Sequence, residues 1–117
     1  MSKSPTIESY KFGHIVIDGE SYNEDVINLP EGVEPHWWRD KGHVLQPQDL
    51  DKVIEAKPEA VVVGQGAHGR MRITAEARER LEGANIEVIA APTEEACETY
   101  SEIRESRYAA AALHLTC

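Results

Sequence analysis

The sequence predicts an α/β domain with a parallel βαβαβ C-terminal half and an irregular, β-rich N-terminal half. Segment 60–63 is a continuous apolar run, and 86–90 and 109–115 are predominantly apolar, as strands buried in a sheet require. The segments between these runs carry apolar residues at helical spacing. Strands and helices that alternate through short links predict crossover connections and parallel pairing.

Helix signals occur at three places in the C-terminal half. Proline suits a first helical turn, so a helix is expected over 47–56. Thr74 is a suitable N-cap for a second helix, and Gly83 is a suitable residue just past its end. Pro92 and Thr93 open a third helix. The expected buried faces are Leu50, Val53 and Ile54, then Ile73, Ala77 and Leu81, and then Ala96, Tyr100 and Ile103.

Short extended segments are expected in the N-terminal half, at 7–12, 14–17 and 26–29. Asp18-Gly19 follows the second segment. This dipeptide is typical of a type I′ hairpin turn, because glycine accepts a positive φ. This half is too short to form a domain of its own, so residues 1–117 are interpreted as a single domain packed on the parallel half.

Charge and composition exclude several classes of partner. The chain has 12 Lys and Arg against 21 Asp and Glu, a net charge of −9. Such a surface repels phosphate backbones and anionic lipid, so nucleic acid and membrane are not expected partners. No apolar run is long enough to span a bilayer. The charge instead favours a basic protein partner or a cationic ligand.

Cysteine use and the first residues indicate a cytoplasmic protein. The two cysteines, Cys97 and Cys117, form no C-x-x-C pair, and no Cys/His set has zinc-ligand spacing. The N-terminus shows no signal or transit pattern. We therefore expect a reducing compartment, no metal and no cofactor. We also predict no catalytic residues, since no paired carboxylates or triad can be recognised.

Residues 64–69 spell G-x-G-x-x-G directly after a buried strand. In a dinucleotide-binding fingerprint the helix begins inside the motif, and an acid ends the next strand. Here the N-cap at Thr74 comes too late, and the next strand ends without an acid. Dinucleotide binding is therefore not expected. The alternative interpretation is a turn that needs positive φ or close backbone packing.

A small-anion site at the same place stays open. Ligands of open α/β sheets bind beyond the carboxyl ends of the strands, where the 64–70 loop and the 92–93 turn both lie. The side chains and amides there can converge on an anion near the start of the third helix. The candidate ligand-binding residues are Gly64, Gln65, Gly66, His68, Arg70 and Thr93.

An interface is the other candidate. Trp37 and Trp38 are adjacent, so on a strand their rings point to opposite faces and one of them can be exposed. Arg39 follows, in one of the few positive segments of the chain. An exposed tryptophan beside arginine is typical of an interface anchor for an acidic partner. The alternative is that both rings cover the core.

The chain also resembles a known family along nearly its whole length. The resemblance rests on Pro58-Glu59 followed by 61–66, on Pro92-Thr93 with Ala96 and Tyr100, on Trp38-Arg39 with Gly42-His43, and on the closing segment 109–117. These residues are similar to a small-domain family of unknown function that includes a mitochondrial complex I assembly factor and an adipogenesis-associated protein. The resemblance implies a three-layer α/β domain with a mixed central sheet. Gln65 stands where the family usually has threonine.

Two functions are compatible with these observations. The first is a non-enzymatic interaction or assembly domain with a protein partner. The second is a small-molecule or anion-binding protein, or an enzyme, that uses the crevice near 64–70 and 92–93. No oligomeric state is predicted.

Overall fold

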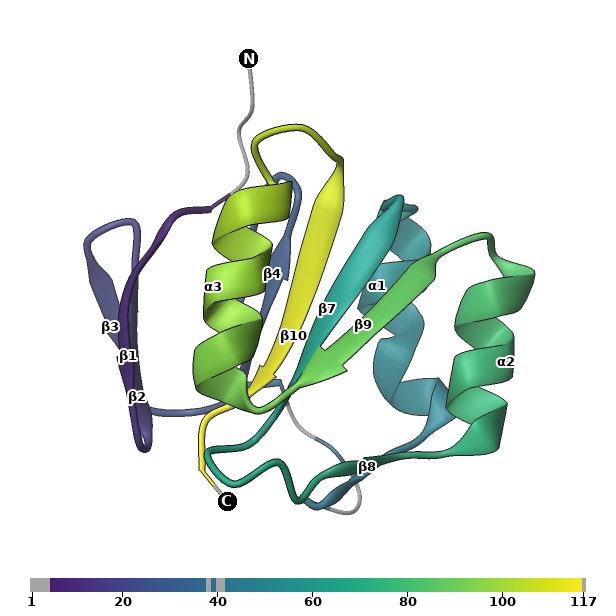
Figure 1. Ribbon diagram of the computed structural model, residues 1–117, viewed down its shortest axis with the longest axis horizontal. Helices are drawn as coiled ribbons and strands as arrows, with labels where there is room; N and C mark the ends of the chain where they lie inside the picture. The colour runs from purple at the N-terminus through teal and green to yellow at the C-terminus, as the bar shows by residue number, and fades with distance from the viewer. Residues whose placement is uncertain (1–4, 38, 40–41, 117) are drawn as a thin grey trace.

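The computed structural model describes residues 5–37, 39 and 42–116. Figure 1 shows a central sheet with helices on both faces, so the predicted three-layer α/β fold with a mixed sheet is confirmed. The sheet has the strand order β5-β4-β10-β7-β9, with β7 parallel to both β10 and β9 and with β4 antiparallel to β10 and β5. The strands are β4 (Val26–Leu29), β5 (Gly32–Glu34), β7 (Ala60–Gln65), β9 (Glu87–Ala91) and β10 (Ala109–His114).

The two central strands, β7 and β10, form the buried middle of this sheet. Every residue of β10 is buried, as are the first five of β7, which explains their continuous apolar sequences. Their side chains alternate between two hydrophobic clusters. Val61 and Val63 join one cluster with Ala110 and Ala112, and Val62 joins the other with Ala109, Ala111 and Leu113. The parallel half thus folds as the sequence predicts.

The helices differ from the prediction at their ends. The first helical segment is split into a 3₁₀ turn, η1 (Pro47–Leu50), and α1 (Asp51–Ala56). The second, α2 (Ala75–Gly83), has the predicted cap, since Thr74 Oγ1 accepts a hydrogen bond from the Ala77 amide. The prediction for its C-terminal end is wrong, because Gly83 is still helical and Asn85 takes the positive φ of 62°. The third is α3 (Thr93–Ile103).

The N-terminal half contains a second sheet with the order β1-β2-β3. Asp18 and Gly19 both have positive φ, at 50° and 82°, as the predicted type I′ turn between β2 and β3 requires. Ile15 and Ile17 of β2 are fully buried in the cluster that also contains residues of α3. The strands are β1 (Ile7–Lys11), β2 (His14–Ile17) and β3 (Glu20–Tyr22).

A short parallel pair, β6 (Val44–Leu45) with β8 (Arg72–Ile73), was not predicted. It ties the segment before η1 to the segment before α2, so Ile73 lies in a strand and not on the helix face where the sequence placed it. Within the described part of the chain, no helix is long and apolar enough to cross a membrane.

Candidate functional site

The carboxyl ends of β7, β9 and β10 meet at one edge of the sheet, together with the start of α3 (Figure 1). Gly64 lies there in β7. A Cβ atom added to Gly64 would lie 2.9 Å from Thr93 Oγ1 and 3.0 Å from Leu113 Cδ2. This glycine therefore permits close backbone packing, while Gly66 and Gly69 adopt positive φ values of 95° and 67°. The chain after the glycines leads to β8, not to a helix.

Thr93 is fully buried, and its hydroxyl both accepts and donates a hydrogen bond. Its Oγ1 accepts a hydrogen bond from the Gly66 amide at 2.9 Å and donates one to the His114 carbonyl at 2.5 Å. Because α3 begins at Thr93, this side chain fixes the start of the helix to both parallel strand ends. The hydroxyl has no remaining proton to donate to an anion.

Several other polar groups of the loop are also bonded within the protein. The Thr93 amide donates to the Gly66 carbonyl, and the Ala67 amide donates to the Thr116 carbonyl at 2.7 Å. Gln65 Nε2 donates to the Met71 carbonyl at 3.0 Å and so closes the loop. Gly64, Gly66 and Thr93 thus lie together, as the sequence predicts, and with Gln65 they form a hydrogen-bonded junction; their predicted role in ligand binding stays a prediction.

His68 and Arg70 occupy a different position, because both are exposed on the surface of the same loop. An anion at this edge would be held by these two side chains and not by the groups already bonded. The hairpin between β1 and β2 lies nearby, since the Gly13 amide donates to the Leu115 carbonyl at 2.9 Å. Phe12, next to Gly13, is 60% exposed.

A buried polar cluster that the sequence did not reveal lies where β10 ends. Asp25 Oδ2 accepts hydrogen bonds from Arg39 Nη2 at 2.6 Å and from His114 Nδ1 at 2.7 Å. Asp25 Oδ1 accepts from the Leu115 amide at 2.8 Å. Burial alone would raise the Asp25 pKa, but these three hydrogen bonds and the Arg39 charge outweigh it and lower the pKa.

This cluster is a structural tie. It joins the residue before β4 to the end of β10, and Arg39 Nη2 also donates to the Gly42 carbonyl at 2.9 Å. The His114 ring meets the His43 ring edge to face, with centroids 5.6 Å apart. His114 is buried, at 5% exposure. Asp25 was missed because its partner is 89 residues away.

The interface residues expected at 37–39 are placed differently from the hypothesis. Trp37 is buried, its Nε1 donates to the Asp49 carbonyl at 3.0 Å, and the Arg39 guanidinium lies 4.6 Å from the centre of its ring. The Arg39 side chain is 3% exposed. Neither residue presents the exposed aromatic ring or the exposed charge that an interface there needs. Trp38 lies outside the described residues.

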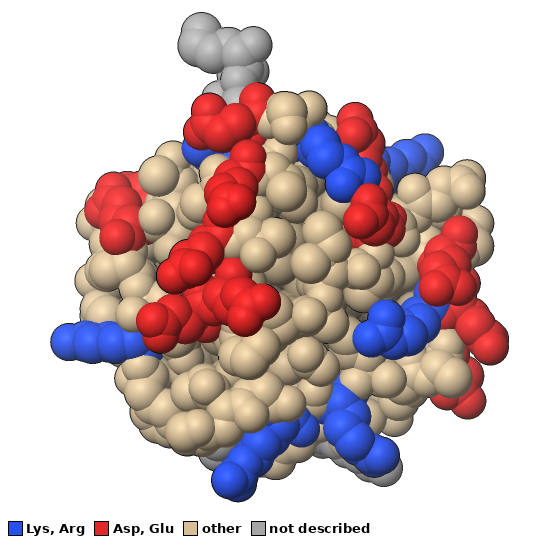
Figure 2. Space-filling model, viewed as in Figure 1, with Lys and Arg blue, Asp and Glu red and all other residues tan. Residues whose placement is uncertain are grey.

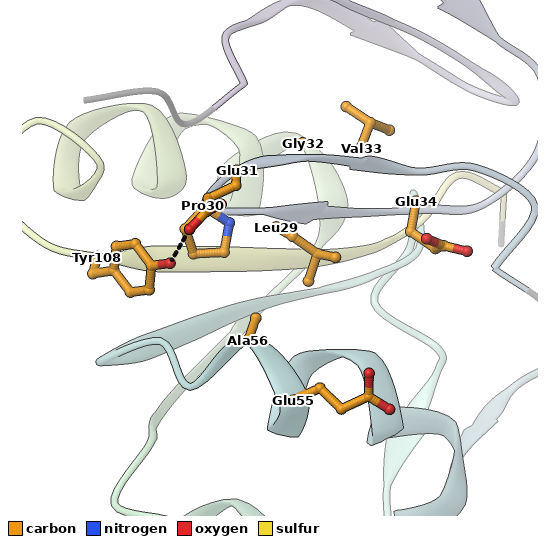
Figure 3. Close-up of a pocket in the computed structure, with 9 residues that line it drawn as sticks. All are labelled: Leu29, Pro30, Glu31, Gly32, Val33, Glu34, Glu55, Ala56 and Tyr108. Carbon is orange, nitrogen blue, oxygen red and sulfur yellow. Dashed lines mark hydrogen bonds between the residues drawn. The ribbon is translucent and has the colours of Figure 1, made fainter. Parts of the chain in front are cut away.

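A hollow lies at the opposite end of β10, with a volume of about 450 Å³. Figure 3 shows Leu29 and Ala56 facing each other there, and Tyr108 donates a hydrogen bond to Glu31 at 3.1 Å. That bond raises the Tyr108 pKa. The other lining residues include Glu34 and Glu55, and the lining has no cation. This hollow is therefore unsuited to an anion.

Among the described residues, no group of three or more His, Cys, Asp or Glu side chains is arranged to hold a metal ion. Charged side chains are unevenly distributed on the face that Figure 2 shows. Figure 2 shows acidic side chains along α3 and basic side chains at the edge where the parallel strands end. On this face the acidic side chains along α3 are separate from the basic side chains at the strand-end edge.

Comparisons with known proteins agree with this fold. The family model described as "Protein of unknown function (DUF498/DUF598)" matches residues 7–114. The structure is similar to the conserved hypothetical protein PH1505 from Pyrococcus horikoshii, at 28% identity and a TM-score of 0.82, over 96% of this chain and 99% of that one. It is also similar to the solved structure MT938, at 27% identity and a TM-score of 0.78, over 97% and 100% of the two chains. A Bartonella henselae protein described as an outer membrane protein shares the fold at 23% identity, with a TM-score of 0.83 and 100% coverage of both chains.

Proposed function

The chain belongs to the DUF498/DUF598 family, whose function is unknown, and we propose that it is a non-enzymatic interaction domain. The single observation that carries this proposal is the internal bonding of the polar groups at the sheet edge. Thr93 Oγ1, Gln65 Nε2 and both carboxylate oxygens of Asp25 are hydrogen-bonded within the protein. A catalytic group needs a proton or lone pair that it can use on a substrate. These residues instead hold the fold together.

We place the interaction at the edge surface, formed by Lys11, Phe12, His68 and Arg70. Phe12 is a large exposed apolar side chain, and Lys11, His68 and Arg70 are exposed as well. The hairpin tip and the 66–70 loop contact consecutive residues of the C-terminal segment, through Leu115 and Thr116. An aromatic anchor among cations suits an acidic protein partner. An assembly role is a specific form of this proposal.

A photo-crosslinking amino acid at position 12 tests the proposal. Tyr108 is the matched control, because it is the other exposed large aromatic of the described residues, at 42%, and lies at the opposite end of β10. We expect p-benzoylphenylalanine at position 12 to form a discrete crosslink in native cells. Lys11→Glu with Arg70→Glu should abolish it. Equal crosslinking from both positions, or a crosslink that survives the charge reversals, would contradict an interaction at the edge surface.

Small-anion binding is the second candidate, favoured by the exposed side chains of His68 and Arg70 on one loop. Phosphate titrated into ¹⁵N-labelled protein should then shift the amide resonances of His68, Arg70 and Gly66. Arg70→Gln should remove these shifts. Shifts confined to the hairpin at Asp18 and Gly19 would place an anion elsewhere.

We also propose a reducing, cytoplasmic location, which the buried free thiol of Cys97 supports.

A further inference from the structure

A groove runs between β1 and α3, on a different part of the surface from the edge described above. Its volume is about 480 Å³. One wall is the consecutive stretch Ile7–Tyr10, and the other is a stripe of α3 that includes Glu94, Cys97, Glu98 and Glu102. Positions 94, 98 and 102 are four residues apart and therefore lie on one side of the helix.

The β1 wall is the unpaired edge of a sheet. In the order β1-β2-β3, β1 pairs with β2 alone, and its other side faces α3. Lys11 and His14 flank a two-residue turn and thus form a hydrogen-bonded pair, so the next pair, Tyr10 with Ile15, is non-hydrogen-bonded. The Tyr10 amide and carbonyl therefore point away from β2, to the free edge of β1, and the pairing is regular from Ser9 to Lys11, after a register shift between Ile7 and Ser9. An exposed row of such groups is a template for another strand.

The groove is also strongly acidic. Glu8, Glu94, Glu98 and Glu102 line it, and none of these four forms an ion pair within the described part of the chain. Figure 2 shows this as a band of acidic side chains along α3. Native proteins usually protect sheet edges with charge that repels other strands. Here the charge repels acidic segments and attracts basic ones.

We propose that the β1–α3 groove binds a basic, extended peptide segment of a partner protein by strand addition to β1. Main-chain groups of the segment pair with the free edge of β1, and its Lys or Arg side chains reach Glu94, Glu98 and Glu102. The intervening apolar side chains contact Ile7, Tyr10 and Cys97 on the groove floor. Main-chain bonds supply the register, and the carboxylates select the charge.

An alternating Lys-Val heptapeptide with blocked ends is the test probe. Titrated into ¹⁵N-labelled protein, it should shift the amides of Ile7–Tyr10 and of Glu94–Glu102, and should protect the Tyr10 amide from hydrogen exchange. Glu98→Gln with Glu102→Gln should weaken binding about fivefold, the effect expected for two exposed ion pairs. The matched control is Glu79→Gln with Glu82→Gln, which removes the same charge from exposed positions of α2 and should leave affinity nearly unchanged.

Two further peptides separate strand addition from simple charge attraction. A Glu-Val peptide should not bind. A Lys-Val peptide N-methylated at alternate residues keeps its charge but loses main-chain donors, and should bind at least tenfold more weakly. Equal binding of the methylated and unmethylated peptides would overturn strand addition, and equal weakening by the α2 control would overturn the groove as the site. Neither result would bear on the edge surface, which the crosslinking at position 12 tests separately.

Discussion

The hydroxyl of Thr93 donates a hydrogen bond to the carbonyl of His114 across 2.5 Å. Thr93 is the first residue of α3, and His114 is the last residue of β10. The same oxygen accepts from the Gly66 amide. One hydroxyl thus joins the loop after β7, the start of α3 and the end of β10. This junction occupies the place where many α/β proteins hold a ligand.

Thr93→Val should destabilise the protein by about 2–4 kcal/mol, because it leaves the Gly66 amide and the His114 carbonyl buried without a partner. Urea unfolding measures this loss. Thr93→Ser is the matched control, since it keeps the hydroxyl and removes a methyl group, and it should cost about 1 kcal/mol. If serine and valine were equally destabilising, the hydroxyl would not be the stabilising group.

Gly64→Ala should cost about 1–3 kcal/mol by overpacking. The new Cβ would lie 2.9 Å from Thr93 Oγ1 and 3.3 Å from Thr93 Cα, and neither atom can move without disturbing the start of α3. Gly32→Ala in β5 is the control, because a Cβ there meets nothing within 4 Å. Thermal or urea unfolding of the two variants gives the comparison. A neutral Gly64→Ala would contradict close packing as the role of this glycine.

The C-terminal half was predictable because its signals are local. Predominantly apolar segments specify β7, β9 and β10, and the Thr74 side chain caps its helix as its sequence position suggests. The end of α2 was not predictable from Gly83, because asparagine also tolerates the left-handed region and Asn85 takes that conformation. The β6–β8 pair was missed since it joins two-residue strands that are distant in sequence.

The position of the candidate site was predictable from the sequence, but the hydrogen bonds of its residues were not. The sequence brought Gly64, Gly66 and Thr93 to one sheet edge, yet it gave no sign that the Thr93 hydroxyl is bonded to His114. Arg39, which was expected at the surface, is buried in an ion pair with Asp25. Both outcomes depend on contacts between residues far apart in the chain, which composition and periodicity do not encode.

The largely buried carboxylate of Asp25 should make stability depend on acid pH. Its pKa in the folded protein is below the ordinary 3.8, so the ionised form stabilises the fold. This contribution is complete above the ordinary value and is lost as the pH falls through the lower folded-state pKa. Asp25→Asn should therefore cost about 3 kcal/mol at pH 7, and the difference from wild type should shrink below about pH 4.

Urea unfolding of both proteins at a series of pH values tests this prediction. Asp51→Asn is a suitable control, because Asp51 pairs with Arg80 at the surface and its side chain is 62% exposed. That variant should lose less than about 1 kcal/mol at pH 7. A stability difference for Asp25→Asn that stays constant from pH 7 to pH 3 would show that its carboxylate is not the stabilising form.

The thiol of Cys97 should be almost unreactive in the folded protein. Burial is the main cause that raises its pKa to about 12, and the nearby charges of Glu94 and Glu98 raise it further. The reactive thiolate is then a fraction of about one in ten thousand at pH 8. In a Cys117→Ser background, a disulfide reagent should modify Cys97 far more slowly in native protein than in urea.

Glu94→Gln with Glu98→Gln should lower the pKa of the Cys97 thiol, measured from thiolate absorbance. The pKa should stay above the ordinary 9.0, because the thiol is still buried. Equal reaction rates in native and unfolded protein would contradict a buried thiol beside the acidic groove.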